Sequence, residues 1–414
     1  MEDYRRAGVV CVMRALLISL LWLCFQSNAL ASEVLSENYE QSILDTIKKI
    51  QSQNHAQALD STRRLIKQYP NSRLGQMLYA DLLLAKTEPL AQIGSGIPTA
   101  QAVLDFTQEI QLRWQHDTHP VHKGLLPGNI LFIANDQPYV ILVDQQSSRI
   151  YVYRNEQGVP VLETDYFITI GLKGPGKQKR GDQKTPIGIY HVTRYIDDQQ
   201  LPDLYGRGAF PISYPNVWDQ RKQRTGGGIW IHGTPSYTYN RSPLASNGCI
   251  VVSNPDFSNI DQYISAGFKT PVIVAQHVNW LTETQWRQQR SEMQQVLNNW
   301  ISDWESLNHD RYRQNYSQTD FYAQNRDFKN WDARKHWINR DKTRIEVNYS
   351  DLNIFNYPGE ENLVLMQFSQ TYDSNDFDSK SPKELYWRMD GSGWKIVYEG
   401  VRIFPKVGIE IVEN

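Results

Sequence analysis

Apolar residues recur at spacings of three and four in the N-terminal part of the chain. Ile43, Ile47 and Ile50 share one face at this spacing, which is the pattern of an amphipathic helix. Pro70 interrupts the pattern because proline ends a helix. The spacing therefore predicts a helical region over 32–127.

A helical hairpin predicted across 55–86 resembles a single tetratricopeptide-like unit. The resemblance rests on the segment ALDSTRRLIKQYP followed by LGQMLYADLLLA. No second copy follows at a period of about 34 residues. We therefore expect a helical cap or docking module instead of a repeat array, with a cell-wall or envelope protein as a candidate partner of this region or of the C-terminal domain.

From residue 129 the pattern changes to short runs rich in Val, Ile, Tyr and Phe, separated by polar or glycine-bearing breaks. Such runs are typical of β-strands. They lie at 130–134, 139–144, 149–154, 166–171, 185–193, 227–235 and 271–275. Together they predict a mostly-β domain over 128–276, a sandwich or a barrel with few helices.

Helical spacing returns at 282–304, where Thr282 and Gln285 form the sequence pattern of a capping box. Strand-like runs follow at 344–357, 362–373, 383–390 and 394–404. Helix followed by antiparallel sheet predicts an α+β domain over 283–414. The chain of 414 residues is therefore expected to be multidomain.

Residues 1–31 have the order of a secretory signal peptide. Arginines precede an apolar run at 15–25, and Ala29-Leu30-Ala31 supplies the small residues of a cleavage site. The apolar run is shorter than the roughly 20 residues of a membrane span. We predict cleavage after Ala31 and export to the periplasm or cell envelope, with an uncleaved N-terminal anchor as the alternative.

The composition of the chain argues against several classes of protein. The 43 Lys and Arg against 45 Asp and Glu give a formal net charge of −2, which argues against a nucleic-acid partner. The 3 Cys are too few for a disulfide scaffold or a multi-cysteine metal site. Cys11 and Cys24 are predicted to leave with the signal peptide, so Cys249 is the one thiol expected in the mature chain.

Cys249 stands in a segment that suits nucleophilic catalysis. Ser246, Asn247 and Gly248 precede it, and His232 lies upstream at the end of an apolar run. An imidazole near a thiol can take its proton and hold an ion pair with the thiolate. The amides of Gly248 and Cys249 are candidates for an oxyanion site. The alternative is a buried, inert cysteine beside a structural histidine.

The segment resembles the signature of the L,D-transpeptidase catalytic domain, the YkuD family, which has His-Gly followed at a similar spacing by Ser-x-Gly-Cys. The segment VDQQSSRIYVYRNEQG at 143–158 is similar to the opening hairpin of that domain. The segment GDQKTPIGIYHV at 181–192 is similar to its Thr-Pro-x-Gly-x-aromatic turn. The resemblance covers roughly 135–275.

The resemblance implies a role for each matching residue. Cys249 is the nucleophile and His232 its base. Ser246 and Gly233 help to orient the histidine, and Gly248 shapes the oxyanion site.

Two positions depart from many family members. Asn247 stands where they have His, and Val251 stands where they have an Arg that would steer a carboxylate of the peptide stem. Arg241 or Arg224 is a candidate replacement for that Arg. The aromatic residues that could line a groove over the thiol are Tyr205, Trp218, Tyr237 and Tyr239.

The implied reaction is acyl transfer on peptidoglycan stem peptides. The Cys249 thiolate attacks the carbonyl of the third stem residue, typically diaminopimelate, and the terminal D-Ala leaves with a proton from His232. An amine of another stem then opens the thioester and gives a 3→3 cross-link. A lipoprotein lysine, a free D-amino acid or water are alternative acceptors, and water would make the enzyme a carboxypeptidase or amidase. The reaction needs neither a metal nor an organic cofactor.

Residues 283–414 resemble the cone-shaped domain of the nuclear-transport-factor or SnoaL type, which implies accessory binding of a glycan or a protein. A catalytically inactive wall-binding scaffold is the alternative from a different functional class. A sortase fits the spacing poorly, and an NlpC-type peptidase has Cys before His, the reverse of the order here.

Overall fold

The computed structural model describes residues 38–87, 94, 100–120, 123–264, 269–323 and 326–402. The predicted signal peptide lies outside these residues. The chain divides into two compact units at Tyr69 and Pro70, so the helices expected as one region over 32–127 are shared between the two units. In the described part of the chain, no helix has the length and apolar character needed to cross a membrane.

The first unit contains helices α2 (Tyr39–Gln51) and α3 (His55–Gln68), which pack on each other. Ile43 and Ile47, two of the residues whose spacing predicts a helix, are buried. The ammonium of Lys49 on α2 donates to the hydroxyl of Ser61 on α3, with Nζ and Oγ 2.7 Å apart. Apolar burial and this polar contact together join the pair.

The second unit begins with helices α4 (Arg73–Leu84) and α5 (Ala100–Thr118). The Ser72 hydroxyl accepts the Gly75 amide and caps the N-terminus of α4, where an unpaired amide would otherwise remain. Since α3 ends at Gln68 and α4 begins at Arg73, the helix break predicted at Pro70 lies between these two helices.

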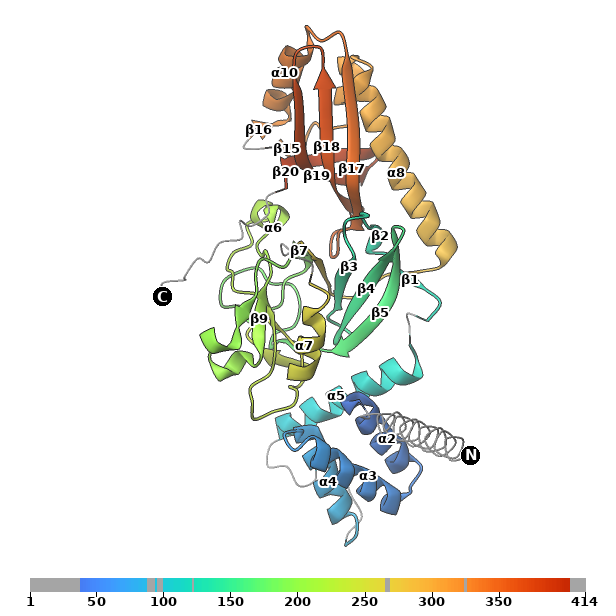
Figure 1. Ribbon diagram of the computed structural model, residues 1–414, viewed down its shortest axis with the longest axis vertical. Helices are drawn as coiled ribbons and strands as arrows, with labels where there is room; N and C mark the ends of the chain where they lie inside the picture. The colour runs from blue at the N-terminus through green and yellow to red at the C-terminus, as the bar shows by residue number, and fades with distance from the viewer. Residues whose placement is uncertain are drawn as a thin grey trace, which may run out of the picture. The chain divides into compact units, whose positions relative to one another are not determined.

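The central domain is mostly β, as its sequence pattern predicts (Figure 1). One sheet has the order β5-β4-β3-β13-β7, a second has the order β12-β10-β9-β8, and two smaller sheets pair β11 with β6 and β1 with β14. Their bounds are β1 (Leu126–Pro127), β3 (Tyr139–Asp144), β4 (Arg149–Glu156), β5 (Val159–Phe167), β6 (Ile170–Gly171), β7 (Gly188–His191), β8 (Ile196–Asp197), β9 (Gly208–Pro211), β10 (Trp230–His232), β11 (Leu244–Ser246), β12 (Ile250–Val251), β13 (Pro271–Ala275) and β14 (Trp280–Leu281). The short helices α6 (Val217–Arg221) and α7 (Asn254–Asp261) lie between strands.

The C-terminal domain has the predicted α+β composition. Helix α8 (Glu283–Glu305) begins with the capping box of Thr282 and Gln285, which the structure confirms. Figure 1 shows α8 and α10 beside a long antiparallel sheet. The remaining elements are α9 (His309–Arg313), α10 (Phe328–Asn339), β15 (Tyr322–Ala323), β16 (Arg326–Asp327), β17 (Ile345–Asn356), β18 (Leu363–Ser374), β19 (Asp378–Asp390) and β20 (Gly393–Val401).

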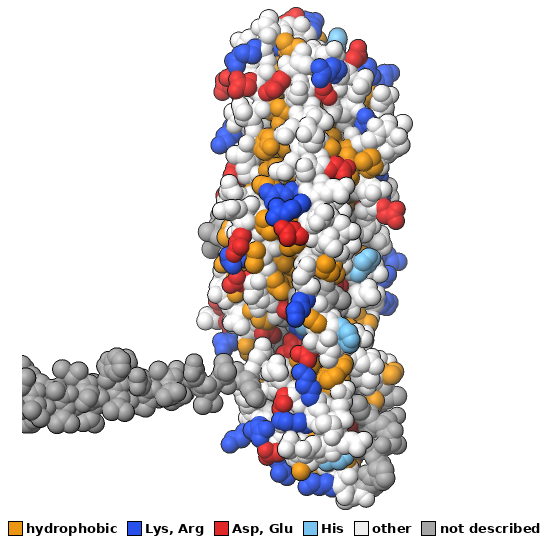
Figure 2. Space-filling model, turned by 90° about the vertical axis from the view of Figure 1, so that its right-hand side faces the viewer, with side chains coloured by type: hydrophobic (Ala, Val, Ile, Leu, Met, Phe, Trp, Pro, Cys, Tyr) orange, Lys and Arg blue, Asp and Glu red, His pale blue; other side chains and the backbone are white. Residues whose placement is uncertain are grey.

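The face of the molecule in Figure 2 shows acidic and basic side chains interspersed, with no broad field of one sign.

Strand β2 (Ile130–Phe132) does not join the central sheets, although its residues were expected to open that domain. It pairs with β17 and completes a seven-stranded sheet of the order β16-β15-β20-β19-β18-β17-β2. Ile130 and Leu131 are fully buried, because β2 gains an apolar neighbour on the edge of the long sheet. The two domains are therefore joined by backbone hydrogen bonds as well as by the chain.

A shared core lies where the two domains meet. It combines Val140 and Leu142 of β3 with Phe355 of β17 and Leu365 of β18. Trp218 of α6 belongs to the same core. Its indole ring stacks on the ring of Tyr386 in β19, with ring centroids 5.3 Å apart and planes 10° apart. Apolar burial of this kind is the main stabilising contribution at such a junction.

Polar contacts surround the shared core. The guanidinium of Arg221 on α6 donates to a carboxylate oxygen of Asp320 at 2.5 Å, and that of Arg388 on β19 donates to the other oxygen at 3.0 Å. Asp320 therefore holds one cation from each domain.

We expect Trp218→Ala to lower the free energy of unfolding of the second unit by about 3–5 kcal/mol, the usual cost of truncating a buried Trp. Trp218 is 1% exposed, whereas Trp337 is 64% exposed, so Trp337→Ala is the matched control with little expected effect. Denaturant unfolding followed by tryptophan fluorescence and circular dichroism measures both. Equal midpoints for the two variants would contradict the role of Trp218 in the shared core.

Candidate active site

Parallel pairing of β10 with β12 brings the predicted nucleophile and base onto one face of a sheet. Ile231 pairs with Ile250, and His232 pairs with Val251. Ile231 and Ile250 are buried in the core, so their neighbours along each strand point to the opposite face. Cys249 comes directly before β12 and so lies beside Trp230, one side-chain position from His232.

The His232 imidazole is buried, at 3% exposure, and one of its nitrogens is already bonded. Nδ1 lies 2.7 Å from the carbonyl oxygen of Gly233. A carbonyl can only accept, so Nδ1 carries the proton and Nε2 presents a lone pair. The ring of Tyr205 meets the imidazole edge-on, with centroids 5.0 Å apart. These contacts fix both the orientation and the tautomer expected of a base.

The Cys249 thiol is half-buried and bonded at two positions. Sγ lies 3.5 Å from the carbonyl oxygen of Gly228, to which the thiol donates. The backbone amide of Trp230 in turn donates to the sulfur, which favours the thiolate. Gly228 lies just before β10 and Trp230 begins it, so the strand that carries His232 also holds the thiol.

Burial decides the protonation states at rest. It raises the pKa of the Cys249 thiol above its ordinary value, although Trp230, Lys177 and Arg241 act in the opposite direction. Burial lowers the pKa of His232 to about 4, although its bond to Gly233 opposes the shift. Both pKa shifts favour a neutral thiol beside a neutral imidazole at pH 7. The thiolate–imidazolium ion pair expected from the sequence is therefore not the favoured resting state, and the proton must move during attack.

Ser246 organises the turn before Cys249. Its hydroxyl donates to the Cys249 carbonyl at 2.6 Å and accepts the Gly248 amide at 3.1 Å. The contact that orients His232 comes from the Gly233 carbonyl, so the structure gives Ser246 a positioning role in the turn. The Gly248 amide is occupied by this bond, which leaves the Cys249 amide as the better oxyanion donor of the two.

Thr185 supports the same turn, a role that sequence reasoning missed. Its hydroxyl donates to the Gly248 carbonyl at 2.9 Å and accepts the Gly171 amide at 2.9 Å. Thr185 is fully buried. The available signal was the Thr-Pro pair at the start of the Thr-Pro-x-Gly-x-aromatic turn.

The loop from Gly233 to Gly248 carries most of the other predicted residues. Gly233 has no room for a side chain because a Cβ there would collide with the Asn254 amide oxygen. Asn247 is exposed, and its side-chain oxygen accepts from Gln183 at 3.3 Å. The backbone at the start of the loop is therefore held in place at Gly233, whereas the side chain of Asn247 at the end of the loop is accessible to solvent.

Of the two candidate cations, Arg241 and Arg224, Arg241 is the one whose charge acts on the reacting groups. Its guanidinium donates to the Ala245 carbonyl, and its charge acts on the pKa of both Cys249 and His232. Tyr237 is 63% exposed on the same loop. The Tyr239 amide donates to the Asn71 carbonyl at 2.9 Å. These three residues lie on the loop between His232 and Cys249.

Two other predicted residues lie elsewhere. Trp218 stacks on Tyr386 in the shared core, so it does not line a groove over the thiol. Arg224 donates to the buried carboxylate of Asp219 at 3.0 Å, which makes its guanidinium a structural partner and not a free cation for substrate. In the part of the chain that the structure describes, no three His, Cys, Asp or Glu side chains gather in a group suited to hold a metal ion.

The pKa directions predict how Cys249 reacts with iodoacetamide. Because the thiolate is the nucleophile, the alkylation rate is expected to rise with pH and to reach half its maximum above about 8.5, the pKa of a free cysteine. Mass spectrometry of the Cys249 peptide measures the rate, with N-acetylcysteine as the control thiol. A rate plateau between pH 5 and 7 would instead reveal a thiolate–imidazolium pair at rest.

Gly248→Ala is expected to abolish activity dependent on Cys249. Gly248 has φ +121, and a Cβ there would lie 2.7 Å from the Lys184 carbonyl oxygen, so an alanine must displace the turn that carries the thiol. Gly227→Ala is the matched control, since open space surrounds a Cβ at Gly227. The two variants are compared by Cys249 alkylation and by melting temperature. Equal alkylation rates would argue against the proposed constraint.

Comparisons with known proteins agree with this geometry. Residues 138–274 match the L,D-transpeptidase catalytic domain of the YkuD family, and residues 292–400 match the Cds6 C-terminal NTF2-like domain. A comparison with curated protein sequences gives no match.

Two solved proteins share much of the fold. Bd1075 from Bdellovibrio bacteriovorus is 28% identical with a TM-score of 0.60, over 68% of this chain and 99% of its own. The helical cell shape determining protein Pgp2 from Campylobacter jejuni is 26% identical with a TM-score of 0.55, over 66% of this chain and 95% of its own. The chain therefore carries a catalytic domain of the YkuD L,D-transpeptidase family followed by an NTF2-like domain.

Proposed function

We propose that the protein is an exported L,D-transpeptidase that acts on the tetrapeptide stems of peptidoglycan through a Cys249 thioester. The observation that carries the proposal is the placement of Cys249 beside the strand of His232, with Nδ1 of the imidazole bonded to Gly233. This arrangement leaves Nε2 as a base on the face that holds the thiol.

The first half-reaction follows from the neutral resting pair. His232 takes the thiol proton as the sulfur attacks the carbonyl of the third stem residue. Negative charge develops on the carbonyl oxygen, and the Cys249 amide donates a hydrogen bond to it. The imidazolium then protonates the nitrogen of the leaving D-Ala, and the stem remains bound to sulfur as a thioester.

The second half-reaction uses the same base in the reverse direction. An amine of a second stem loses a proton to His232 and attacks the thioester carbonyl. The C–S bond breaks, the amide bond forms, and the sulfur recovers its proton from the imidazolium. With water in place of the amine, the same steps release a shortened stem.

The resemblance to Pgp2, which determines helical cell shape, supports a role in cell-wall architecture. The signal-peptide pattern at 1–31 supports action in the periplasm or envelope, where the stems are found. The NTF2-like domain is proposed to bind a glycan or a protein partner that directs the catalytic domain.

The test is incubation of the protein with purified disaccharide-tetrapeptides, followed by mass spectrometry. We expect dimers with a 3→3 bond and release of D-Ala. Cys249→Ala should lose at least about 10⁴-fold in rate, as for loss of other catalytic nucleophiles. Cys249→Ser is the conservative control, with the shape of the thiol and a poorer nucleophile.

The products separate the alternatives. Shortened monomers without dimers would show a carboxypeptidase using the same thiol. Unchanged muropeptides with every variant would contradict both enzymes and favour a wall-binding scaffold. A carbapenem adduct on the intact protein that is absent from Cys249→Ala gives an independent measure of nucleophilicity.

A further inference from the structure

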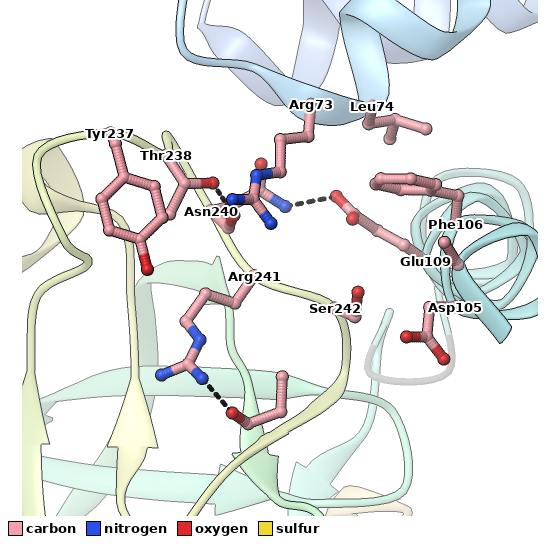
Figure 3. Close-up of a pocket in the computed structure, with 12 residues that line it drawn as sticks. Arg73, Leu74, Asp105, Phe106, Glu109, Tyr237, Thr238, Asn240, Arg241 and Ser242 are labelled. Atoms are coloured by element: carbon pink, nitrogen blue, oxygen red, sulfur yellow. Dashed lines mark hydrogen bonds between the residues drawn. The ribbon is translucent and has the colours of Figure 1, made fainter. Parts of the chain in front are cut away.

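A pocket of about 260 Å³ lies between helices α4 and α5 and the loop that joins His232 to Cys249. Arg73 and Leu74 line it from α4, residues 102–109 from α5, and residues 237–245 from the loop. Figure 3 shows Arg73 reaching into it from α4, with Tyr237 and Arg241 on the loop side and Asp105 and Glu109 on the α5 side. Residues 138–274, which match the family, include the loop but neither helix. The helical half of the pocket therefore lies outside the segment that matches the family.

The helices are held to the loop by specific polar contacts. Asn240 on the loop donates to a carboxylate oxygen of Glu109 at 2.6 Å, and the same oxygen accepts from Arg113 at 3.0 Å. The Asn71 side chain donates to the Ser236 carbonyl at 2.7 Å. These bonds make the pocket a built part of the second unit.

Two cations in the pocket have no acidic partner among the residues that the structure describes. Among the described residues, neither Arg73 nor Arg241 lies within ion-pair distance of a carboxylate. Arg73 packs over the ring of Tyr237, with its guanidinium carbon 5.4 Å from the ring centroid. Within the described part of the chain, the Arg241 guanidinium donates to the Ala245 carbonyl alone. Its pKa is lowered, first by burial, and the charge of Arg73 also contributes to the fall. The negative charge of a bound anion would oppose both effects, because it favours the charged form of each guanidinium.

An acidic group faces these cations across the pocket. The Asp105 carboxylate accepts from Gln101 at 2.8 Å on the same helix, and no described cation pairs with it. The pocket therefore offers positive charge on one side and negative charge on the other. A residue that carries a carboxylate and an ammonium on one carbon matches this pattern.

We propose that this pocket binds the side-chain end of a diamino-diacid residue in a peptidoglycan stem, with its carboxylate between Arg73 and Arg241 and its ammonium toward Asp105. The proposal rests on the proposed function and adds a subsite from outside the catalytic domain. A volume of about 260 Å³ is below the roughly 300–1,000 Å³ of small-molecule sites, which suits one residue of a peptide and not a glycan chain. Arg241 lines this pocket, and its charge also acts on the pKa of the Cys249 thiol.

The experiment measures stem binding to the full chain carrying Cys249→Ala, by isothermal titration calorimetry. One probe is a tetrapeptide stem with diaminopimelate, and the other has lysine at the same position and so lacks the side-chain carboxylate. We expect Arg73→Gln to weaken binding of the diaminopimelate stem about tenfold, as for loss of a charge-assisted hydrogen bond. Binding of the lysine stem is expected to change less than about twofold.

Arg340→Gln is the matched control. Arg340 also packs over an exposed aromatic ring, that of Trp337, at 5.8 Å, but it lies in the C-terminal domain. Its removal should leave binding of both stems unchanged. Equal weakening of both stems by Arg73→Gln, or no weakening of either, would overturn the proposal.

Because the binding experiment uses the Cys249→Ala protein, its result can be judged separately from whether the enzyme converts muropeptides. If the protein with Cys249 converts muropeptides while Arg73→Gln binds both stems normally, the subsite is wrong and the enzyme stands. If the selective loss is found but no muropeptide is converted, the proposed function fails and the subsite stands. With an active enzyme, Arg73→Gln should also raise KM for the diaminopimelate stem about tenfold with kcat nearly unchanged.

Discussion

Parallel pairing between β10 and β12 is the constraint on which the candidate site depends. It aligns His232 with Val251 and so places Cys249, two residues earlier, beside Trp230 on the same face. A shift by one residue would turn the imidazole or the thiol into the core. The pairing involves few residues, so the turn must be fixed from outside. Ser246 and Thr185 do this through bonds to the Cys249 and Gly248 carbonyls.

Burial keeps Cys249 and His232 in their neutral, poorly reactive forms before substrate binds. A thiol and an imidazole kept neutral at pH 7 by raised and lowered pKa values remain poorly reactive until a substrate enters. A carbonyl held at the oxyanion amide then makes proton transfer and attack favourable together. In the oxidising compartment predicted for the protein, a thiol in its neutral form is also less easily oxidised than a thiolate.

Much of the architecture could be predicted from periodicity. Strands β3 and β13 have the bounds that the sequence predicts, and the capping box of Thr282 opens α8 as expected. The local sequence could not show that β2 pairs with β17, because an apolar run fits the edge of any sheet. The motif around Cys249 predicted which residues lie together. It could not show that burial would disfavour their ion pair, or that Trp218 would face the C-terminal domain, since both depend on distant packing.

The place of β2 also decides how these domains can be separated. Residues 130–132 precede the segment 138–274 that matches the catalytic domain, yet they form the outer strand of the C-terminal sheet. A C-terminal domain excised at α8 would leave β17 with an unpaired edge, and such edges recruit other chains. A catalytic domain excised alone would carry an apolar strand with no sheet to complete. Each domain therefore needs the other in order to fold with all its strands paired.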